Sequence, residues 1–230
     1  MNKAHQMAVL SEYAYLMPQK FIQICKTFTP SFHSAKGTQC YTLWDDNTLV
    51  FAFRGTELKL DDIKTDLDFL KVDTSHGKVH AGFLSAYEDF KPKIEADYNM
   101  LSSGRRVYFT GHSLGSALAT LSIDDLGKAE DSLYTFGSPR VGCSAFATQF
   151  NKRFKNTFRY RNENDIVTRE PMALLGYRHV GDSYYYTGSG DLIINPSWWK
   201  RFKEYGKGIW KDKLDMFKDH AISNYVRLTS

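Results

Sequence analysis

The chain contains few cysteines, and their arrangement does not suggest a metal site. Cys25, Cys40 and Cys143 are the three cysteines among its 230 residues, and their spacing matches no metal-site pattern. Because disulfides are scarce inside cells, so small a number favours a reduced compartment, and a bridge between Cys25 and Cys40 is the alternative. We therefore expect no metal centre.

Long apolar runs are also missing. None approaches the roughly 20 residues of a membrane-spanning helix, and Ser11, Glu12 and Tyr13 interrupt the apolar stretch that a secretory signal would need near the N-terminus. We expect a soluble protein without a transmembrane segment. The cytoplasm is the favoured location, with leaderless secretion or removal of a leader as alternatives.

Neither sign of charge dominates the chain, which argues against nucleic acid as a partner. It has 30 basic and 26 acidic residues, a net charge of +4, and no arginine-rich run or zinc-finger spacing. The exception is segment 196–218, in which seven basic and three acidic residues lie among aromatic residues at helical spacing. We expect this segment to pack on the protein's own core, with peripheral contact with an anionic lipid surface as the alternative.

No linker rich in proline, glycine or serine divides the chain, and no internal repeat is present. With 42% apolar residues, 230 residues are enough to build one substantial core. We expect a single domain that comprises residues 1–230.

What the sequence does have is a regular alternation of strand and helix patterns. Helical spacing predicts an opening helix from Ala8 that closes near Pro18, and another from Gly82 to about Met100. A hairpin is predicted over 38–54, with its turn at Asp45-Asp46-Asn47. The later elements are strand 106–110, helix 114–127, strand 132–136, helix 144–153, strand 157–161 and a strand-like stretch at 184–187. This order indicates an α/β fold with a mostly parallel central sheet flanked by helices, whose reactive loops lie at the carboxyl ends of the strands.

One pentapeptide, Gly111-His112-Ser113-Leu114-Gly115, stands where a strand pattern meets a helix pattern. A serine on so sharp a turn is held in a strained conformation that exposes its hydroxyl, and the flanking glycines let the neighbouring backbone approach. The sequence therefore predicts a nucleophile elbow at Ser113. A glycine-rich turn without catalytic meaning is the alternative.

A nucleophilic serine needs a histidine base and a carboxylate that orients the base, and in this type of fold they follow in the order Ser, Asp or Glu, His. Asp165 lies on the loop that follows the strand at 157–161, and it is favoured as the acid over Glu163 and Glu170 because Ile166 and Val167 would pack behind it. His220 lies late in the chain and is favoured as the base over His179.

Two further histidines are set aside as bases. His112 is excluded because neighbouring side chains on the elbow diverge, and His80 precedes the serine.

The developing oxyanion needs hydrogen-bond donors. The backbone N–H of Leu114, directly after the nucleophile, is one candidate, and the Arg54-Gly55-Thr56 loop supplies another, with the Thr56 hydroxyl as a further donor. A plain turn at the end of a strand is the alternative for this loop.

Taken together, these segments resemble the class 3 lipase family, the fungal-lipase-like branch of the α/β-hydrolases. The resemblance runs from the hairpin to the end of the chain. Six motifs in family order carry it, at 50–56, 80–83, 111–115, 135–142, 164–167 and 219–225.

The resemblance implies specific roles for matching residues. Ser113 would be the nucleophile, Asp165 and His220 its partners, and Thr56 with Leu114 the oxyanion hole. His80 and His179 would be structural. The sequence departs from the family at Ser116, where glycine is usual, and at Thr168, where proline is usual.

The family also carries a lid after the Arg-Gly-Thr motif, and segment 57–66 is similar in position and length. Leu58, Leu60 and Ile63 would face the site when such a lid is closed. An ordinary surface helix is the alternative.

The predicted activity is a serine carboxylic-ester hydrolase that acts on lipid esters through an acyl-enzyme, without metal or organic cofactor. A phospholipase A-type, feruloyl-type or short-chain esterase would use the same triad. A transacylase and a lipid-binding protein without activity are the remaining alternatives.

Overall fold

The computed structural model describes residues 2–55, 69–163, 165–197 and 219–230. Thr56, the predicted lid at 57–66 with Leu58, Leu60 and Ile63, and most of the basic aromatic segment at 196–218 lie outside the described residues.

An eight-stranded sheet forms the centre of the molecule, in the order β1-β2-β3-β6-β7-β9-β11-β12. The five strands from β3 to β11 pair in parallel, and the edges at β1, β2 and β12 are antiparallel. The strands are β1 (Thr29–Ala35), β2 (Thr38–Trp44), β3 (Thr48–Phe53), β6 (Arg106–His112), β7 (Ser132–Phe136), β9 (Thr157–Asn162), β11 (Asp182–Tyr186) and β12 (Leu192–Ile194). The predicted hairpin and mostly parallel sheet are confirmed.

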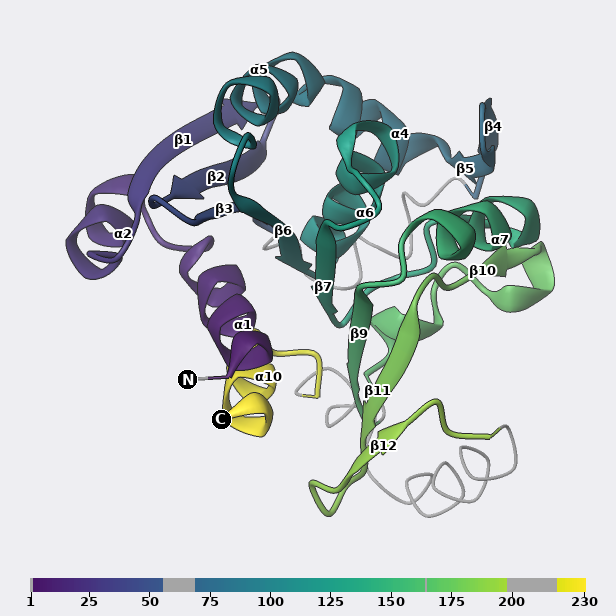
Figure 1. Cartoon of the computed structure of the whole chain (residues 1–230). Coiled ribbons are helices and arrows are strands. Elements are labelled where there is room, and N and C mark those ends of the chain that lie inside the picture. The colour runs from purple at the N-terminus through teal and green to yellow at the C-terminus, as the bar shows by residue number, and fades with distance from the viewer. Residues whose placement is uncertain (1, 56–68, 164, 198–218) are drawn as a thin grey trace.

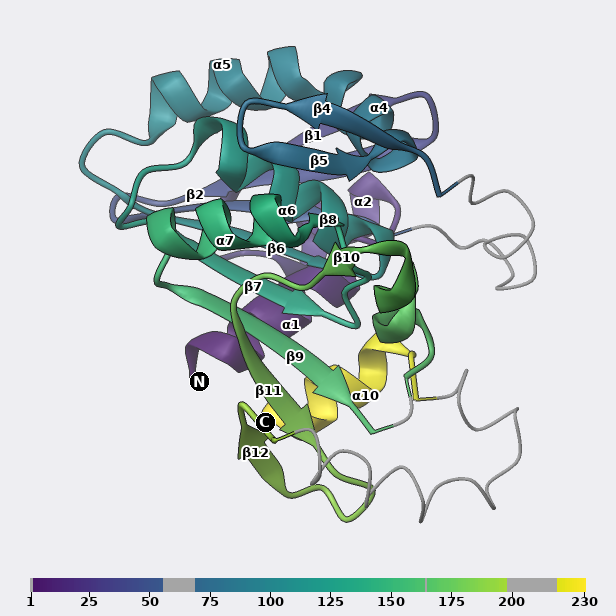
Figure 2. The ribbon, with the colours of Figure 1, turned by 90° about the vertical axis from the view of Figure 1, so that its right-hand side faces the viewer.

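Helices cover both faces of this sheet (Figures 1 and 2). On one face lie α4 (Ala81–Glu88), α5 (Lys91–Leu101), α6 (Leu114–Leu126) and α7 (Ser144–Arg153). On the other lie α1 (Lys3–Tyr13) and α10 (Ile222–Thr229), whose outer ends bring the two chain termini side by side: Asn2 Nδ2 donates to the Thr229 carbonyl over 2.9 Å. Because both faces are covered, β3 is apolar at every position from Leu49 to Phe53.

Smaller elements complete the fold. They are α2 (Pro18–Ile24), two single 3-10 turns at Val167–Arg169 and Ala173–Leu175, and a small second sheet of β10 (Tyr177–Arg178), β8 (Gly142–Cys143), β5 (Gly77–His80) and β4 (Lys71–Thr74). The sequence patterns did not predict α2 or the strands β1, β4, β5, β8, β10 and β12.

Two predicted helix boundaries are wrong, and proline explains both. Pro18 begins α2 instead of closing the first helix, because a proline in the first turn lacks only an N–H that would be unpaired there. The pattern from Gly82 to Met100 is two helices that meet at Asp89–Phe90, since Pro92 is tolerated in the first turn of α5 but not inside a continuous helix.

The alternative of a Cys25–Cys40 bridge is also wrong, since both thiols are free. Cys40 packs in the core on the α4–α7 face, whereas Cys25 packs in the core on the α1 face. The sheet separates the two sulfur atoms. Among the described residues, no helix is long and apolar enough to cross a membrane.

Candidate active site

Ser113 lies in the turn between β6 and α6, at the carboxyl edge of the sheet. Its backbone has φ 56° and ψ −128°, in the positive-φ region that non-glycine residues rarely occupy. The turn is closed by glycines: a Cβ on Gly111 would overlap the Gly115 carbonyl group, and a Cβ on Gly115 would overlap the carbonyl oxygen of Phe53 in β3. The packed backbone of three segments therefore imposes the strained conformation of Ser113.

Ser116, one of the departures from the family pattern, stabilises this turn. Its buried hydroxyl lies 2.6 Å from the carbonyl oxygen of Gly111 and 3.1 Å from that of Phe136. The Ser113 N–H also donates to Phe136 O, over 3.0 Å. A serine at position 116 thus joins the elbow to the end of β7.

Asp165 and His220 meet at the same edge, from the loops after β9 and before α10. The His220 Nδ1 lies 2.9 Å from Asp165 Oδ2 and 3.0 Å from Oδ1, so Nδ1–H donates to the carboxylate and leaves Nε2 as the basic nitrogen. Asp165 is completely buried, and Val167 N–H also donates to its Oδ1. Burial by itself would raise the pKa of Asp165, but the charge of His220 together with the hydrogen bonds from His220 and Tyr225 outweighs burial, so this pKa is lowered and the carboxylate stays ionised.

Gly137, within the motif at 135–142, permits this meeting. It has φ +58°, and a Cβ there would lie 2.8 Å from Asp165 Oδ2 and 2.9 Å from the His220 ring. It directly follows Phe136, whose carbonyl group binds Ser113 N–H. The pair of Asp165 and His220 and the serine therefore lie against the same strand end.

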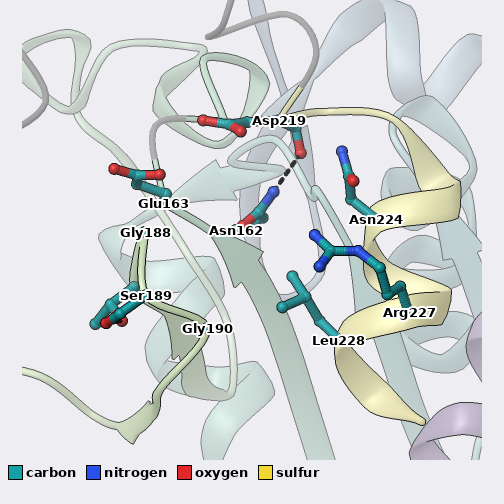
Figure 3. A pocket seen from close by; sticks show the side chains of 10 residues that line it. Asn162, Glu163, Gly188, Ser189, Gly190, Asp219, Asn224, Arg227 and Leu228 are labelled. Atoms are coloured by element: carbon teal, nitrogen blue, oxygen red, sulfur yellow. Dashed lines mark hydrogen bonds between the residues drawn. The ribbon is translucent and has the colours of Figure 1, made fainter. Parts of the chain in front are cut away.

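The rival acids lie elsewhere. Glu163 lines a polar pocket of about 270 Å³ beside α10, together with Ser189, Asn224 and Arg227 (Figure 3). Glu170 precedes Pro171, and its carbonyl oxygen accepts the N–H of Arg140 over 2.7 Å. The carboxylate that binds His220 Nδ1 is that of Asp165.

The rival histidines occupy structural positions. His179 is half-buried with Nε2 2.8 Å from the Thr168 carbonyl oxygen, and desolvation holds its pKa well below the ordinary value. His80 is the N-terminal cap of α4, where its Nδ1 accepts Phe83 N–H over 3.4 Å, and its ring stacks on Phe83.

Of the two predicted oxyanion-hole residues, Leu114 lies among the described residues and Thr56 does not. Leu114 is the first residue of α6, where N–H groups have no partner within the helix. The loop after β3 lies against the elbow, because a Cβ on Gly55 would be 3.2 Å from the Ser113 Cβ. Thr56 itself is outside the described residues.

Sequence reasoning missed three residues that surround the acid and base. The Tyr225 hydroxyl donates to Asp165 Oδ2 over 2.5 Å, and burial raises its pKa well above the ordinary value. His112 Nε2 lies 2.6 Å from the carbonyl oxygen of His220, and the Tyr15 hydroxyl lies 2.8 Å from His112 Nδ1. The motif at 219–225 contains Tyr225, so the sequence could have indicated a role for this residue. No motif or pattern around Tyr15 distinguished it from other tyrosines.

No cluster of three or more histidine, cysteine or acidic side chains in the described part of the chain could hold a metal ion. The groups that do converge are a serine in a strained turn and a hydrogen-bonded Asp–His pair. Such groups carry out nucleophilic catalysis with general-base assistance.

Comparison with known proteins gives consistent results. The family model described as "Lipase (class 3)" matches residues 50–175. A lipase of Rhizomucor miehei is 36% identical over 162 residues, covering 65% of this chain and 44% of that protein. A secreted mono- and diacylglycerol lipase of Malassezia restricta is 31% identical over 202 residues, covering 77% of this chain and 64% of that protein. The chain thus spans about half the length of these relatives.

The solved structure of a triacylglycerol lipase, whose catalytic centre is described as a serine protease triad, superimposes with a TM-score of 0.78. The two sequences are 26% identical, and the match covers 95% of this chain and 92% of the other. The fold is therefore that of an α/β-hydrolase, as predicted. The Malassezia relative is named as secreted, so the predicted preference for the cytoplasm has no support here, and secretion stays open.

Proposed function

The chain belongs to the class 3 lipase family, and from that premise we propose that it is a serine hydrolase of carboxylic esters, with Ser113, Asp165 and His220 as its triad. The observation that carries this proposal is the buried Asp165–His220 hydrogen bond of 2.9 Å at the strand end that also holds Ser113. An imidazole with Nδ1–H on a buried carboxylate keeps Nε2 free to take the serine proton.

In the proposed reaction, His220 Nε2 removes the proton of Ser113 as its Oγ attacks the ester carbonyl carbon. The resulting oxyanion accepts hydrogen bonds from Leu114 N–H and from Thr56, each of which contributes roughly 3 kcal/mol. The imidazolium then protonates the leaving alcohol, and an acyl-enzyme forms on Ser113. Water, deprotonated by His220, adds to the acyl carbonyl carbon and forms a second tetrahedral intermediate. When this intermediate collapses, the bond between the acyl carbon and Ser113 Oγ breaks, Oγ regains the proton from His220, and the acid is released.

For the substrate we propose lipid esters, and a group of exposed apolar side chains, here called the apolar rim, supports this choice. Leu70 and Leu174 are 59% and 95% exposed, and Lys71 Nζ joins their segments by donating to the Leu175 carbonyl group over 2.5 Å. The rim consists of Phe69, Leu70, Val72, Met172, Leu174 and Leu175, all more than a third exposed. An apolar patch of this kind is typical of a surface that meets lipid or protein.

A soluble short-chain esterase is the second candidate, because the triad itself does not select a chain length. The names of the relatives, "lipase" and "mono- and diacylglycerol lipase", favour the lipid substrate. We also propose that residues 1–230 act as one catalytic domain.

The activity is tested with a fluorophosphonate probe, which reacts with an activated serine. We expect the protein to be labelled and the Ser113→Ala variant to remain unlabelled at equal folded content. Labelling that persists in Ser113→Ala would refute the assigned nucleophile, and an unlabelled wild-type protein would refute the enzyme assignment.

The substrate is tested separately, by hydrolysis of p-nitrophenyl butyrate in solution and of diacylglycerol emulsions. Leu174→Ser together with Leu70→Ser should reduce hydrolysis of the emulsion about tenfold, while hydrolysis of the soluble ester stays within about twofold. Activity on soluble esters alone would identify an esterase.

A further inference from the structure

The general base lies on a loop, and two polar contacts hold the backbone of that loop. The carbonyl oxygen of Asp219, just before His220, accepts a hydrogen bond from Asn162 Nδ2 over 2.9 Å (Figure 3). The carbonyl oxygen of His220 itself accepts one from His112 Nε2 over 2.6 Å. The carbonyl groups on both sides of the catalytic imidazole are thus held by side chains.

Both donors stand on rigid elements. Asn162 is the last residue of β9 and His112 the last residue of β6, two strands of the parallel core that end at the catalytic edge. Asn162 is 7% exposed and His112 is 5% exposed. The loop with the base is therefore attached to the same sheet that fixes the nucleophile.

The carbonyl oxygen of His220 determines the tautomer of His112. A carbonyl oxygen can only accept, so His112 carries its proton on Nε2, and Nδ1 accepts the hydroxyl proton of Tyr15, over 2.8 Å. Desolvation, followed by the charge of His220, lowers the pKa of His112 to about 3, so the ring is neutral at physiological pH. A neutral ring is needed here, because its centroid lies only 4.4 Å from that of His220, which becomes cationic during the reaction.

Asn162 also contributes to the acid. Its backbone N–H donates to the Tyr225 hydroxyl over 3.1 Å, and that hydroxyl donates to Asp165 Oδ2. One residue at the end of β9 therefore orients both partners of the serine, the histidine through its side chain and the aspartate through its backbone.

We propose that His112 and Asn162 are positioning residues that clamp the backbone of the catalytic histidine from both sides, with the Tyr15 hydroxyl donating to the free Nδ1 of His112. This inference rests on the proposed function. It also assigns a role in the active site to the residue that precedes the nucleophile and to the loop between α1 and α2.

The test uses the full chain, with p-nitrophenyl butyrate as the soluble substrate. His112→Phe keeps a planar ring but removes the donor, and Asn162→Asp keeps the shape but replaces the donor with an acceptor. Because a shift of about 1 Å in a catalytic group costs up to about 100-fold in rate, we expect kcat to fall 10- to 100-fold in each variant while KM changes less than about twofold. The rate of Ser113 labelling by a fluorophosphonate should fall in parallel.

Two further variants distinguish positioning from folding. His112→Gln places an amide donor near the position of Nε2 and should restore kcat to within about fivefold of wild type. Tyr15→Phe leaves the Nε2–H donor of His112 in place but removes the hydroxyl that donates to its Nδ1, and should lower kcat only a few-fold. His33→Gln is the control. It removes a half-buried histidine of β1 that pairs with Asp97 of α5, and it should affect stability without changing kcat.

The outcomes separate the two hypotheses. If His112→Phe and Asn162→Asp lower the melting temperature but retain wild-type kcat, the clamp is refuted while the proposed function stands. The same holds if His112→Gln is as slow as His112→Phe. If wild-type protein is not labelled at all, the proposed function is wrong and the clamp is refuted with it.

Discussion

The two halves of the candidate site are held in position by different means. The nucleophile lies between a strand and a helix that are adjacent in the sequence, and glycine backbone packed against β3 fixes its conformation. The acid and the base lie on loops 55 residues apart, and side-chain hydrogen bonds from Tyr225, Asn162 and His112 fix their positions.

This difference has a consequence for mutations. Close packing of backbone is sensitive to added volume but needs no particular side chain beyond glycine. A hydrogen-bonded loop tolerates changes of volume better, but each loss of a donor leaves a buried polar group unpaired. We therefore expect changes at the elbow to affect stability first, and changes around the base to affect catalysis first.

The largest effect is expected on the loop half, from Asp165→Asn. The amide preserves the shape but favours the wrong tautomer of His220, so kcat should fall on the order of 10⁴-fold with little change in fold. The measurement is kcat on p-nitrophenyl butyrate beside a thermal melt. Glu163→Gln, two residues earlier, is the matched control and should stay within about threefold of wild type; an equal loss in both variants would contradict the assignment of Asp165.

At the elbow, Gly115→Ala should reduce the free energy of unfolding by about 3 kcal/mol, because the added methyl group would overlap the carbonyl oxygen of Phe53. Gly82→Ala is the matched control: it is also the second residue of a helix, but its new Cβ would meet the His80 ring at 3.2 Å, a side chain that can move. Urea titrations should show a change within about 1 kcal/mol for Gly82→Ala. Equal losses of unfolding free energy at the two positions would contradict the inference that backbone packing fixes the elbow.

His112 belongs to both halves, because it precedes the nucleophile and binds the loop of the base. Its lowered pKa makes the free energy of unfolding depend on pH. Its pKa in the fold, about 3, lies below its ordinary value of 6.5, so the unfolded chain binds more protons between these values. Stability is therefore complete above pH 6.5 and is lost as the pH falls, by about 2 kcal/mol between pH 7 and pH 5 from this residue. Urea titrations of His112→Gln should show a shallower pH dependence by that amount. An unchanged slope would mean that His112 is not held neutral beside His220 and Asp165.

The smallest effect is expected from reduction. Cys25 and Cys40 are buried free thiols on opposite faces of the sheet, so dithiothreitol should change the free energy of unfolding by less than about 0.5 kcal/mol. A larger loss would indicate a disulfide and would alter the way in which α2 is joined to the sheet.

Several features followed from the sequence because their causes are local. The alternation of strands and helices predicted the parallel sheet, and Gly111, Ser113 and Gly115 predicted a tight strand-to-helix turn. Asp165 was placed by its loop at the end of a strand and by the apolar residues that follow it, and His220 by chain order. The predicted helix end at Pro18 and the unbroken helix across Pro92 were wrong because a proline can end one helix or begin the next. Only the packing of the following turn decides between the two.

The sequence by itself determined the kinds of groups in the site and their order along the chain, since strand ends, glycines and turn residues carry local signals. Only the tertiary structure decided how those groups are held. Tyr15, His112, Asn162 and Tyr225 act on partners about 60 to 110 residues away, and no local pattern encodes a hydrogen bond across such a distance. The physical reason is that a buried donor finds its acceptor only once the strands, helices and loops that carry both have packed together.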